Sequence, residues 1–303
     1  MRNHRPESGQ IPAFAALKDA ARRARTFVVA GLGGLMASTL AASAQGYALP
    51  GQIGMQTPNS PVAEEIVAFH DKLLLPIIII ISLFVLGLLI YVVARFNEKA
   101  NPVPSKTTHH TLLEVAWTVL PVLILIVIAI PSFRLLGHQL IIPKADVTIK
   151  ITGNQWYWSY AYPKDQGGGF SFDSLIKADN EIDASKGDIR LLSVDNEAVV
   201  PVGKKIRVQV TASDVIHSFT VPAFGVRIDA VPGRLNEAWF QAEREGMYYG
   251  QCSKICGKDH AFMPIAFRVV SEQAYAAWLA AAQKKFAAVP APGQYADSAS
   301  LRQ

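Results

Sequence analysis

Cysteine is scarce in this chain. Its 303 residues contain two, Cys252 and Cys256, and both lie in one loop. Neither belongs to a Cys-x-x-Cys-His run, which argues against a c-type haem and against a fused domain carrying one. No cysteine stands at the cleavage point of the leader described below, which argues against a lipoprotein anchor. The sequence also contains no internal repeat.

A basic face is missing as well. The formal net charge is +5, but residues 1–44 alone carry six basic and two acidic side chains. Of the 29 basic and 24 acidic side chains in the chain, the remaining 23 and 22 nearly cancel. A nucleic-acid-binding domain concentrates positive charge on one face, so we set that class aside. Half of the residues are hydrophobic, enough for one or two domains with a sizeable core.

Residues 22–48 have the pattern of a secretory signal. Three arginines at 22, 23 and 25 precede an apolar, small-residue run, Thr26–Leu40, and Ala42-Ser43-Ala44 fits the small-x-small cleavage pattern. The pattern predicts a signal peptide over 1–44 and a mature start at Gln45. A transmembrane anchor is the alternative, but the glycine and alanine content and the cleavage pattern favour removal.

Two long uncharged runs follow a polar segment, 45–72. Leu73–Ala94 holds 22 residues without a charge, and Val115–Phe133 holds 19. At about 1.5 Å per residue, each approaches or exceeds the length needed to cross a hydrocarbon core of about 30 Å. The sequence therefore predicts a two-helix transmembrane hairpin over 73–137.

The loop between the runs, 95–112, predicts the orientation of the hairpin. It carries Arg95, Lys99 and Lys106 against Glu98 alone. Positive loops stay in the cytoplasm, so residues 45–72 and everything after the second span are expected on the outer side. The predicted signal peptide leads to the same topology.

From residue 138 onward the hydrophobic pattern becomes that of short strands separated by turns. Such spacing predicts an antiparallel sandwich or barrel over 138–288. A helix is expected at Gln273–Ala288, and a loose tail at 289–303. The expected strands are Asp146–Thr152, Ile189–Val194, Lys205–Thr211, Glu237–Gln241 and Ile265–Val270.

The cysteine loop adds a histidine and a methionine, His260 and Met263, at short spacings. A disulfide suits an outer compartment but does not explain the other two residues. The spacing is wrong for a c-type haem, and methionine is a poor ligand for structural zinc. Thiolate, imidazole and thioether together suit copper.

The run Cys256-x3-His260-x2-Met263 matches the ligand loop of a blue-copper sandwich, which needs a second imidazole from an earlier strand. His217 is well placed to supply it. A mononuclear site needs one thiolate, whereas two bridging thiolates can hold two coppers that share one electron. No open coordination position is evident, so the sequence favours an electron relay over a catalytic centre.

Six segments give the chain a close resemblance to subunit 2 of bacterial haem–copper cytochrome c oxidases over most of residues 60–285. The resemblance implies a membrane helical hairpin plus an all-β cupredoxin-like sandwich, in the bacterial inner membrane with the copper domain in the periplasm. The segments are LEVAWTVLP (113–121), GNQWYWSY (153–160), SVDN (193–196), HSF (217–219), DAVPGRLN (229–236) and CSKICGKDHAFM (252–263).

The resemblance also implies the ligands of a dinuclear copper centre called CuA. They are Cys252, Cys256, His217, His260, Met263 and the backbone carbonyl of Lys254. The family usually has glutamate at position 254, whose carboxylate also helps to hold a magnesium ion against subunit 1. Because lysine offers a cation there, no magnesium is expected through this residue.

Further roles follow from the same resemblance. Trp156 is expected to receive electrons from cytochrome c. Glu114 is expected at the entrance of a proton-uptake route; capping its helix or facing headgroups is the alternative. The acidic run from 173 to 197 is either a solvated face or a docking patch for a basic carrier protein. The docking candidates are Asp173, Asp195 and Asp214.

The expected function is that of the oxidase subunit that takes electrons from cytochrome c onto CuA and passes them to haem in subunit 1, where oxygen is reduced. A membrane-tethered copper carrier is the rival from another class; it would not need Trp156, Glu114 or the acidic run. The homologous quinol oxidases share the architecture but lack the copper ligands, which this chain has in full.

Overall fold

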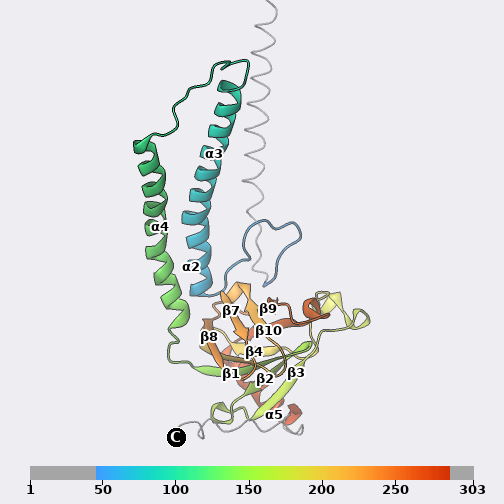
Figure 1. Cartoon of the computed structure of the whole chain (residues 1–303). Coiled ribbons are helices and arrows are strands. Elements are labelled where there is room, and N and C mark those ends of the chain that lie inside the picture. The colour runs from blue at the N-terminus through green and yellow to red at the C-terminus, as the bar shows by residue number, and fades with distance from the viewer. Residues whose placement is uncertain (1–45, 287–303) are drawn as a thin grey trace, which may run out of the picture. The chain divides into compact units, whose positions relative to one another are not determined.

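The computed structural model describes residues 46–286. The predicted signal peptide (1–44), the predicted mature start at Gln45 and the predicted tail (289–303) lie outside the described residues. The described part has two long helical segments followed by strands and a last helix (Figure 1).

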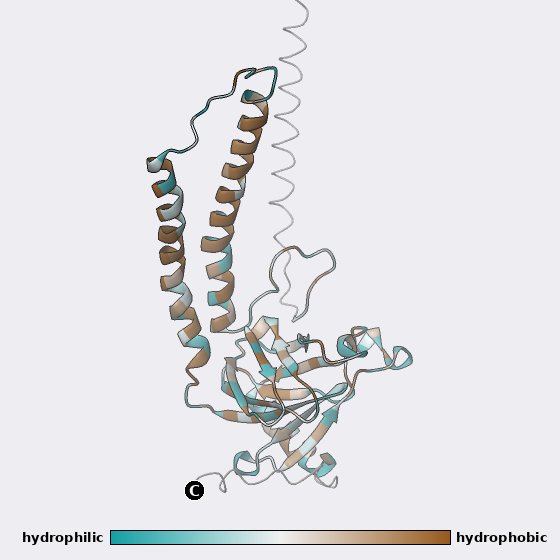
Figure 2. Ribbon diagram, in the orientation of Figure 1, coloured by the Kyte–Doolittle hydropathy of each residue, from teal (hydrophilic) through white to brown (hydrophobic). Residues whose placement is uncertain are grey.

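Both membrane helices are present. The first consists of α2 (Pro61–Phe69), one π-helical turn, η1 (His70–Leu74), and α3 (Leu75–Arg95), and the second is α4 (Thr111–Leu140). Each is long and apolar enough to cross a membrane, and Figure 2 shows mostly hydrophobic residues along both. No side chain of α3 or α4 is buried in the protein, as expected for helices that lipid or other subunits surround.

The start of α2 is fixed by local chemistry. The Ser60 hydroxyl accepts a hydrogen bond from the Ala63 backbone N–H, and Pro61 occupies the first turn, where its missing N–H costs nothing. Ser60 also donates to the carbonyl of Phe224 at 2.8 Å. The start of α2 is therefore hydrogen-bonded to η5 (Pro222–Phe224), a short helix that follows β6.

The strands form a sandwich of two five-stranded sheets, ordered β3-β2-β1-β5-β8 and β4-β10-β9-β6-β7. A last helix, α5 (Glu272–Phe286), packs against β3 and β4. The strand bounds are β1 Val147–Asn154, β2 Tyr157–Tyr162, β3 Phe170–Ser174, β4 Ala198–Pro201, β5 Lys205–Ala212, β6 His217–Val221, β7 Val226–Ala230, β8 Asn236–Gln241, β9 Gly246–Cys252 and β10 Pro264–Val270.

The core between the sheets follows from alternation along the strands. In β2, Trp158, Tyr160 and Tyr162 are buried and their neighbours are not, as a period of two requires when one face is covered. Trp158 packs edge-on against Phe219 of the opposite sheet, with ring centroids 5.5 Å apart. These buried aromatic side chains pack next to the end of the sandwich where β6 begins and β9 ends.

Two expectations about the strands are wrong. The sandwich is not purely antiparallel, because β1 pairs with β5 and β10 pairs with β4 in parallel. Ile189–Val194 forms turns with a single bridge from Val194 to Ile176. Leu191 has a left-handed φ of 69°, and the Ser193 hydroxyl accepts the Ile189 N–H. These local turn contacts replace the ladder that the apolar pattern predicted.

Candidate metal centre

The first half of the donor cluster surrounds Cys252. Its Sγ lies 3.9 Å from Cys256 Sγ, 4.0 Å from His217 Nδ1 and 3.3 Å from the backbone carbonyl oxygen of Lys254. The two thiols and a nitrogen of His217 all lie within 4.8 Å of one another. Three side chains that are far apart in sequence therefore present ligand atoms to one small volume.

The second half surrounds Cys256. Its Sγ lies 3.5 Å from His260 Nδ1 and 3.5 Å from Met263 Sδ. The sulfur–sulfur distance of 3.9 Å to Cys252 is far above the roughly 2.05 Å of a disulfide, and both cysteines are free. The structure thus brings together all six residues predicted as ligands, with one histidine beside each thiol.

Two of these donors, His217 and Cys252, lie at the ends of neighbouring strands of the sandwich. His217 is the first residue of β6 and Cys252 the last of β9, and these antiparallel neighbours place Phe219 opposite Cys252. The chain then loops out and returns through η6 (His260–Phe262) to Met263, whose carbonyl accepts the indole N–H of Trp158 at 3.1 Å. The loop is therefore held at both ends by the core.

The centre is largely closed to water. His217 and Met263 are 0% and 1% exposed, and the two cysteines 6% and 5%. Burial acts to raise the pKa of Cys252. Hydrogen bonds with His217 and with the backbone at Ser218 and Lys254 outweigh burial and lower this pKa to about 6. Burial raises the pKa of Cys256 to about 12, and the Cys252 thiolate adds to the rise.

Two thiolates so close in a buried site repel one another, so both ionise together only with a cation beside them. A bound thiophilic metal supplies that charge, and its affinity then depends on releasing the thiol protons. Two thiolates, two imidazoles and a thioether form a soft to borderline donor set, which suits copper better than calcium or magnesium. The residues therefore fit a copper centre.

Hydrogen bonds outside the donor set hold its two sides. His217 Nε2 donates to the Asp214 carboxylate at 2.8 Å, which leaves Nδ1 directed to Cys252. The same carboxylate accepts the backbone N–H of Gln155 at 2.7 Å, and the Gln155 side chain donates to the Cys256 carbonyl at 2.7 Å. Sequence reasoning missed Gln155 altogether and placed Asp214 only among docking residues.

Two glycines leave room for the site. A Cβ at Gly153 would lie 3.0 Å from ring atoms of His217, and a Cβ at Gly257 would lie 2.7 Å from Cζ2 of Trp156. Gly257 also has a φ of 131°, which only glycine adopts easily. Gly257 directly follows Cys256 in the sequence, a signal that could have suggested close packing there, whereas nothing in the sequence connects Gly153 with His217.

Comparison with known proteins assigns the chain. The family model described as cytochrome c oxidase subunit II, periplasmic domain, matches residues 147–270, and that described as its transmembrane domain matches 48–135. A probable cytochrome c oxidase subunit 2 of Rickettsia bellii is 50% identical over 236 residues, covering 78% of this chain and 86% of the relative. The chain belongs to the cytochrome c oxidase subunit 2 family.

Other members of the subunit 2 family are similarly close. Cytochrome c oxidase subunit 2 of Cereibacter sphaeroides is 48% identical over 271 residues, covering 82% of this chain and 88% of the relative. The crystal structure of the periplasmic domain of subunit II from Bradyrhizobium japonicum is 62% identical. The match covers 48% of this chain and 99% of the crystallised chain, with a TM-score of 0.44. As a member of the cytochrome c oxidase subunit 2 family, the protein is a subunit of an oxidoreductase.

As a member of this family, the chain departs from the expected pattern at Lys254. Its ammonium lies 3.3 Å from the carboxylate of Asp229 on β7, so the nearest acid is already paired with a positive charge. The pairing lowers the pKa of Asp229 in addition to the larger effect of a hydrogen bond from Ser218. These residues do not fit a divalent magnesium ion, whereas the Lys254 carbonyl still faces Cys252.

Trp156 lies in the turn between β1 and β2 rather than on a strand. It is half-buried, packs on Gly257, and has the Lys258 ammonium 5.6 Å from its ring centroid. The expectation that Trp156 shares an extended face with Trp158 and Tyr160 is therefore wrong: the turn directs it to the cysteine loop, while those two enter the core.

The acidic run is neutralised over much of its length. Four of its seven acids form ion pairs, Asp179–Arg190, Asp183–Lys186, Asp188–Lys177 and Glu197–Arg268. Asp173 accepts the Ser159 hydroxyl at 2.6 Å, and Asp195 accepts the Leu175 N–H at 2.8 Å. Both remain exposed, so they are available to a partner in a way that the paired acids are not.

Glu114 lies in the first turn of α4, and its carboxylate accepts the backbone N–H of His110 at 3.3 Å. This contact is the capping arrangement that was the alternative to a proton-uptake role. The side chain remains at the helix start, and the structure brings no other predicted site residue to it.

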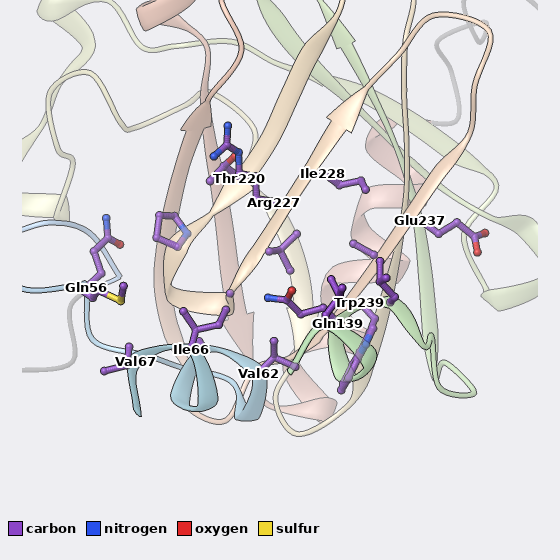
Figure 3. Close-up of a pocket in the computed structure, with 18 residues that line it drawn as sticks. Gln56, Val62, Ile66, Val67, Gln139, Thr220, Arg227, Ile228, Glu237 and Trp239 are labelled. Atoms are coloured by element: carbon purple, nitrogen blue, oxygen red, sulfur yellow. The ribbon is translucent and has the colours of Figure 1, made fainter. Parts of the chain in front are cut away.

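A cavity of about 570 Å³ lies where α2 and the end of α4 meet β7 and β8 (Figure 3). Figure 3 shows Val62 and Ile66 of α2 and Trp239 of β8 around it. Arg227 and Glu237 bring opposite charges to its wall. None of the six donor residues lines this cavity, so it is separate from the candidate metal centre.

Proposed function

We propose that this subunit accepts electrons from cytochrome c at a dinuclear copper centre, CuA, and passes them to haem in subunit 1. The observation that carries the proposal is the arrangement of the donor atoms. The sulfurs of two free thiols lie 3.9 Å apart, and two imidazole nitrogens, a thioether sulfur and a carbonyl oxygen each contact one of them. Bound there, the copper pair supplies reversible one-electron transfer.

The chain's residues have separate tasks in this proposal. Cys252 and Cys256 would hold the coppers as thiolates, and a charge shared between two metals would keep the change in geometry on electron transfer small. His217 and His260 would each add an imidazole beside one of the thiols, and the burial of His217, Met263 and both cysteines limits the access of water to the site. Lys254 contributes its carbonyl, and its paired ammonium leaves no magnesium site through this residue.

Trp156 is the proposed acceptor of electrons from cytochrome c. Its contact with Gly257, next to Cys256, supports this role because the indole reaches the ligand loop directly. Asp173 and Asp195 are proposed to dock a basic cytochrome c, since within residues 46–286 their exposed carboxylates form no ion pair with a lysine or arginine. Long-range attraction of this kind raises association rates more than affinity.

The proposed setting is the bacterial inner membrane with the copper domain in the periplasm. The positive loop 95–112 between the two membrane helices supports a cytoplasmic position for that loop. Residues 1–44 would be the removed signal peptide. Glu114, at the cytoplasmic start of α4, is proposed as the entrance to a proton-uptake route in subunit 1.

The copper content of the full chain tests the proposal. Purified in detergent and loaded with copper, it should hold two coppers per chain and accept electrons from reduced cytochrome c in stopped-flow mixing. Cys256→Ser removes one bridge and should abolish the two-copper stoichiometry, whereas Asp165→Asn, away from the donors, should not. Two coppers without electron transfer from cytochrome c would favour the copper-carrier alternative instead.

A further inference from the structure

A chain of hydrogen bonds connects both sides of the donor cluster to the tryptophan turn. It runs from His217 Nε2 to the Asp214 carboxylate at 2.8 Å, from the Gln155 N–H to the same carboxylate at 2.7 Å, and from Gln155 Nε2 to the Cys256 carbonyl at 2.7 Å. Gln155 directly precedes Trp156. Asp214 and Gln155 thus link His217 and Cys256, a proposed ligand on each side of the site, to Trp156, the proposed electron acceptor.

Both oxygens of the Asp214 carboxylate accept hydrogen bonds in this arrangement. Oδ1 accepts His217 Nε2 and the Val215 N–H at 2.6 Å, and Oδ2 accepts Gln155. Its side chain is 30% exposed, against 0% for His217. An acid that served only to attract a partner would not need three donors from two segments of the chain.

Gln155 has a complementary position. Its backbone N–H bonds to Asp214 on the β5–β6 side of the site, and its side chain bonds to Cys256 in the cysteine loop. The two partners, Asp214 and Cys256, are 42 positions apart in sequence (256 − 214), yet Gln155 contacts both. The two contacts hold the β1–β2 turn in place, and with it the indole that packs on Gly257.

We infer that Gln155 and Asp214 are positioning residues, a clamp that fixes the orientation of His217 and the distance of Trp156 from the cysteine loop. The inference rests on the proposed copper function. Asp214 acts through the imidazole by holding Nε2–H, so that Nδ1 faces Cys252 and would be free to bind copper. Gln155 acts through the turn that carries Trp156. The docking role predicted for Asp214 from sequence stays a prediction beside this role inside the site.

Residues that hydrogen-bond to metal ligands help to orient them, and the loss of such a residue costs about 10- to 100-fold in metal affinity or activity. Asp214→Ala should therefore weaken copper binding by about tenfold or more, measured by competition with a copper chelator, and change the EPR hyperfine pattern. Asp214→Asn keeps an oxygen for Nε2–H and should restore much of both. Asp173→Asn removes an equal charge away from the donors and should leave copper affinity unchanged.

Gln155→Ala retains the backbone N–H and so separates the two halves of the clamp. It should lower the electron-transfer rate at saturating cytochrome c by about tenfold, with the KM for cytochrome c and the copper affinity nearly unchanged. Since Asp214 is intact in this variant, it keeps the test decisive if Asp214→Ala fails to fold.

The outcomes separate the clamp from the function on which it rests. An unmodified chain that binds no copper would overturn the proposed function itself. If the unmodified chain binds two coppers and Asp214→Ala matches Asp173→Asn in copper affinity and EPR pattern, the clamp is wrong and Asp214 acts only in docking. A Gln155→Ala effect confined to KM would likewise overturn the positioning of Trp156.

Discussion

Gly257→Ala tests the contact between the tryptophan turn and the cysteine loop. The new Cβ would lie 2.7 Å from Trp156 Cζ2, and Gly257 has a φ of 131° that alanine adopts only with strain. Strained backbone of this kind costs about 1–3 kcal/mol, and overpacking costs about 1–3 kcal/mol more. The expected loss of stability is therefore about 4 kcal/mol, which lowers the Tm by about 10 °C in a chain of this size.

Thermal unfolding of the copper-free full chain in detergent measures this loss without any contribution from the metal. Gly203→Ala is the matched control, because its φ of 74° imposes strain but its Cβ would meet no atom within 4 Å. It should cost only the backbone part, about 1–3 kcal/mol. Adding Trp156→Ala to Gly257→Ala should recover the overpacking part. Equal losses for the two glycine variants would refute the contact as the cause.

The other predictions concern the site directly. Gly153→Ala would place a Cβ 3.0 Å from the His217 ring and should weaken copper binding in chelator competition, whereas unchanged affinity would contradict the close packing. Trp156→Phe should slow electron transfer from cytochrome c in stopped flow with the copper spectrum intact; a normal rate would remove Trp156 from the site. Lys254→Glu should lower the copper potential and allow Mn²⁺, as a probe for Mg²⁺, to bind to the purified oxidase. An unchanged potential and no Mn²⁺ signal would refute the role given to the Lys254–Asp229 pair.

The helices and the loop donors Cys252, Cys256, His260 and Met263 could be predicted because they depend on local pattern, whereas the Lys254 carbonyl was implied only by the family resemblance. Uncharged runs long enough to span a membrane allow few other structures, and soft ligands at short spacing within one loop remain close whatever the loop conformation. His217 was predicted from outside the loop because a sandwich brings strand ends together. These are statements about composition and spacing, which a sequence contains directly.

The rest depends on tertiary contacts that no local pattern contains. The apolar residues of Ile189–Val194 resemble a strand, but side-chain hydrogen bonds hold them in turns. Alternation suggested a common face for Trp156 and Trp158, yet the turn between β1 and β2 separates them. The clamp joins residues 59 and 101 positions apart, so only the folded chain reveals that Gln155 belongs to the site.

The EPR spectrum of the oxidised, copper-loaded full chain tests the central claim most directly. Two bridging thiolates that hold two coppers sharing one unpaired electron should give a seven-line hyperfine pattern. Cys256→Ser, which removes one bridge, should lose that pattern. A four-line pattern from the unmodified chain would mean one localised copper and would contradict the dinuclear centre.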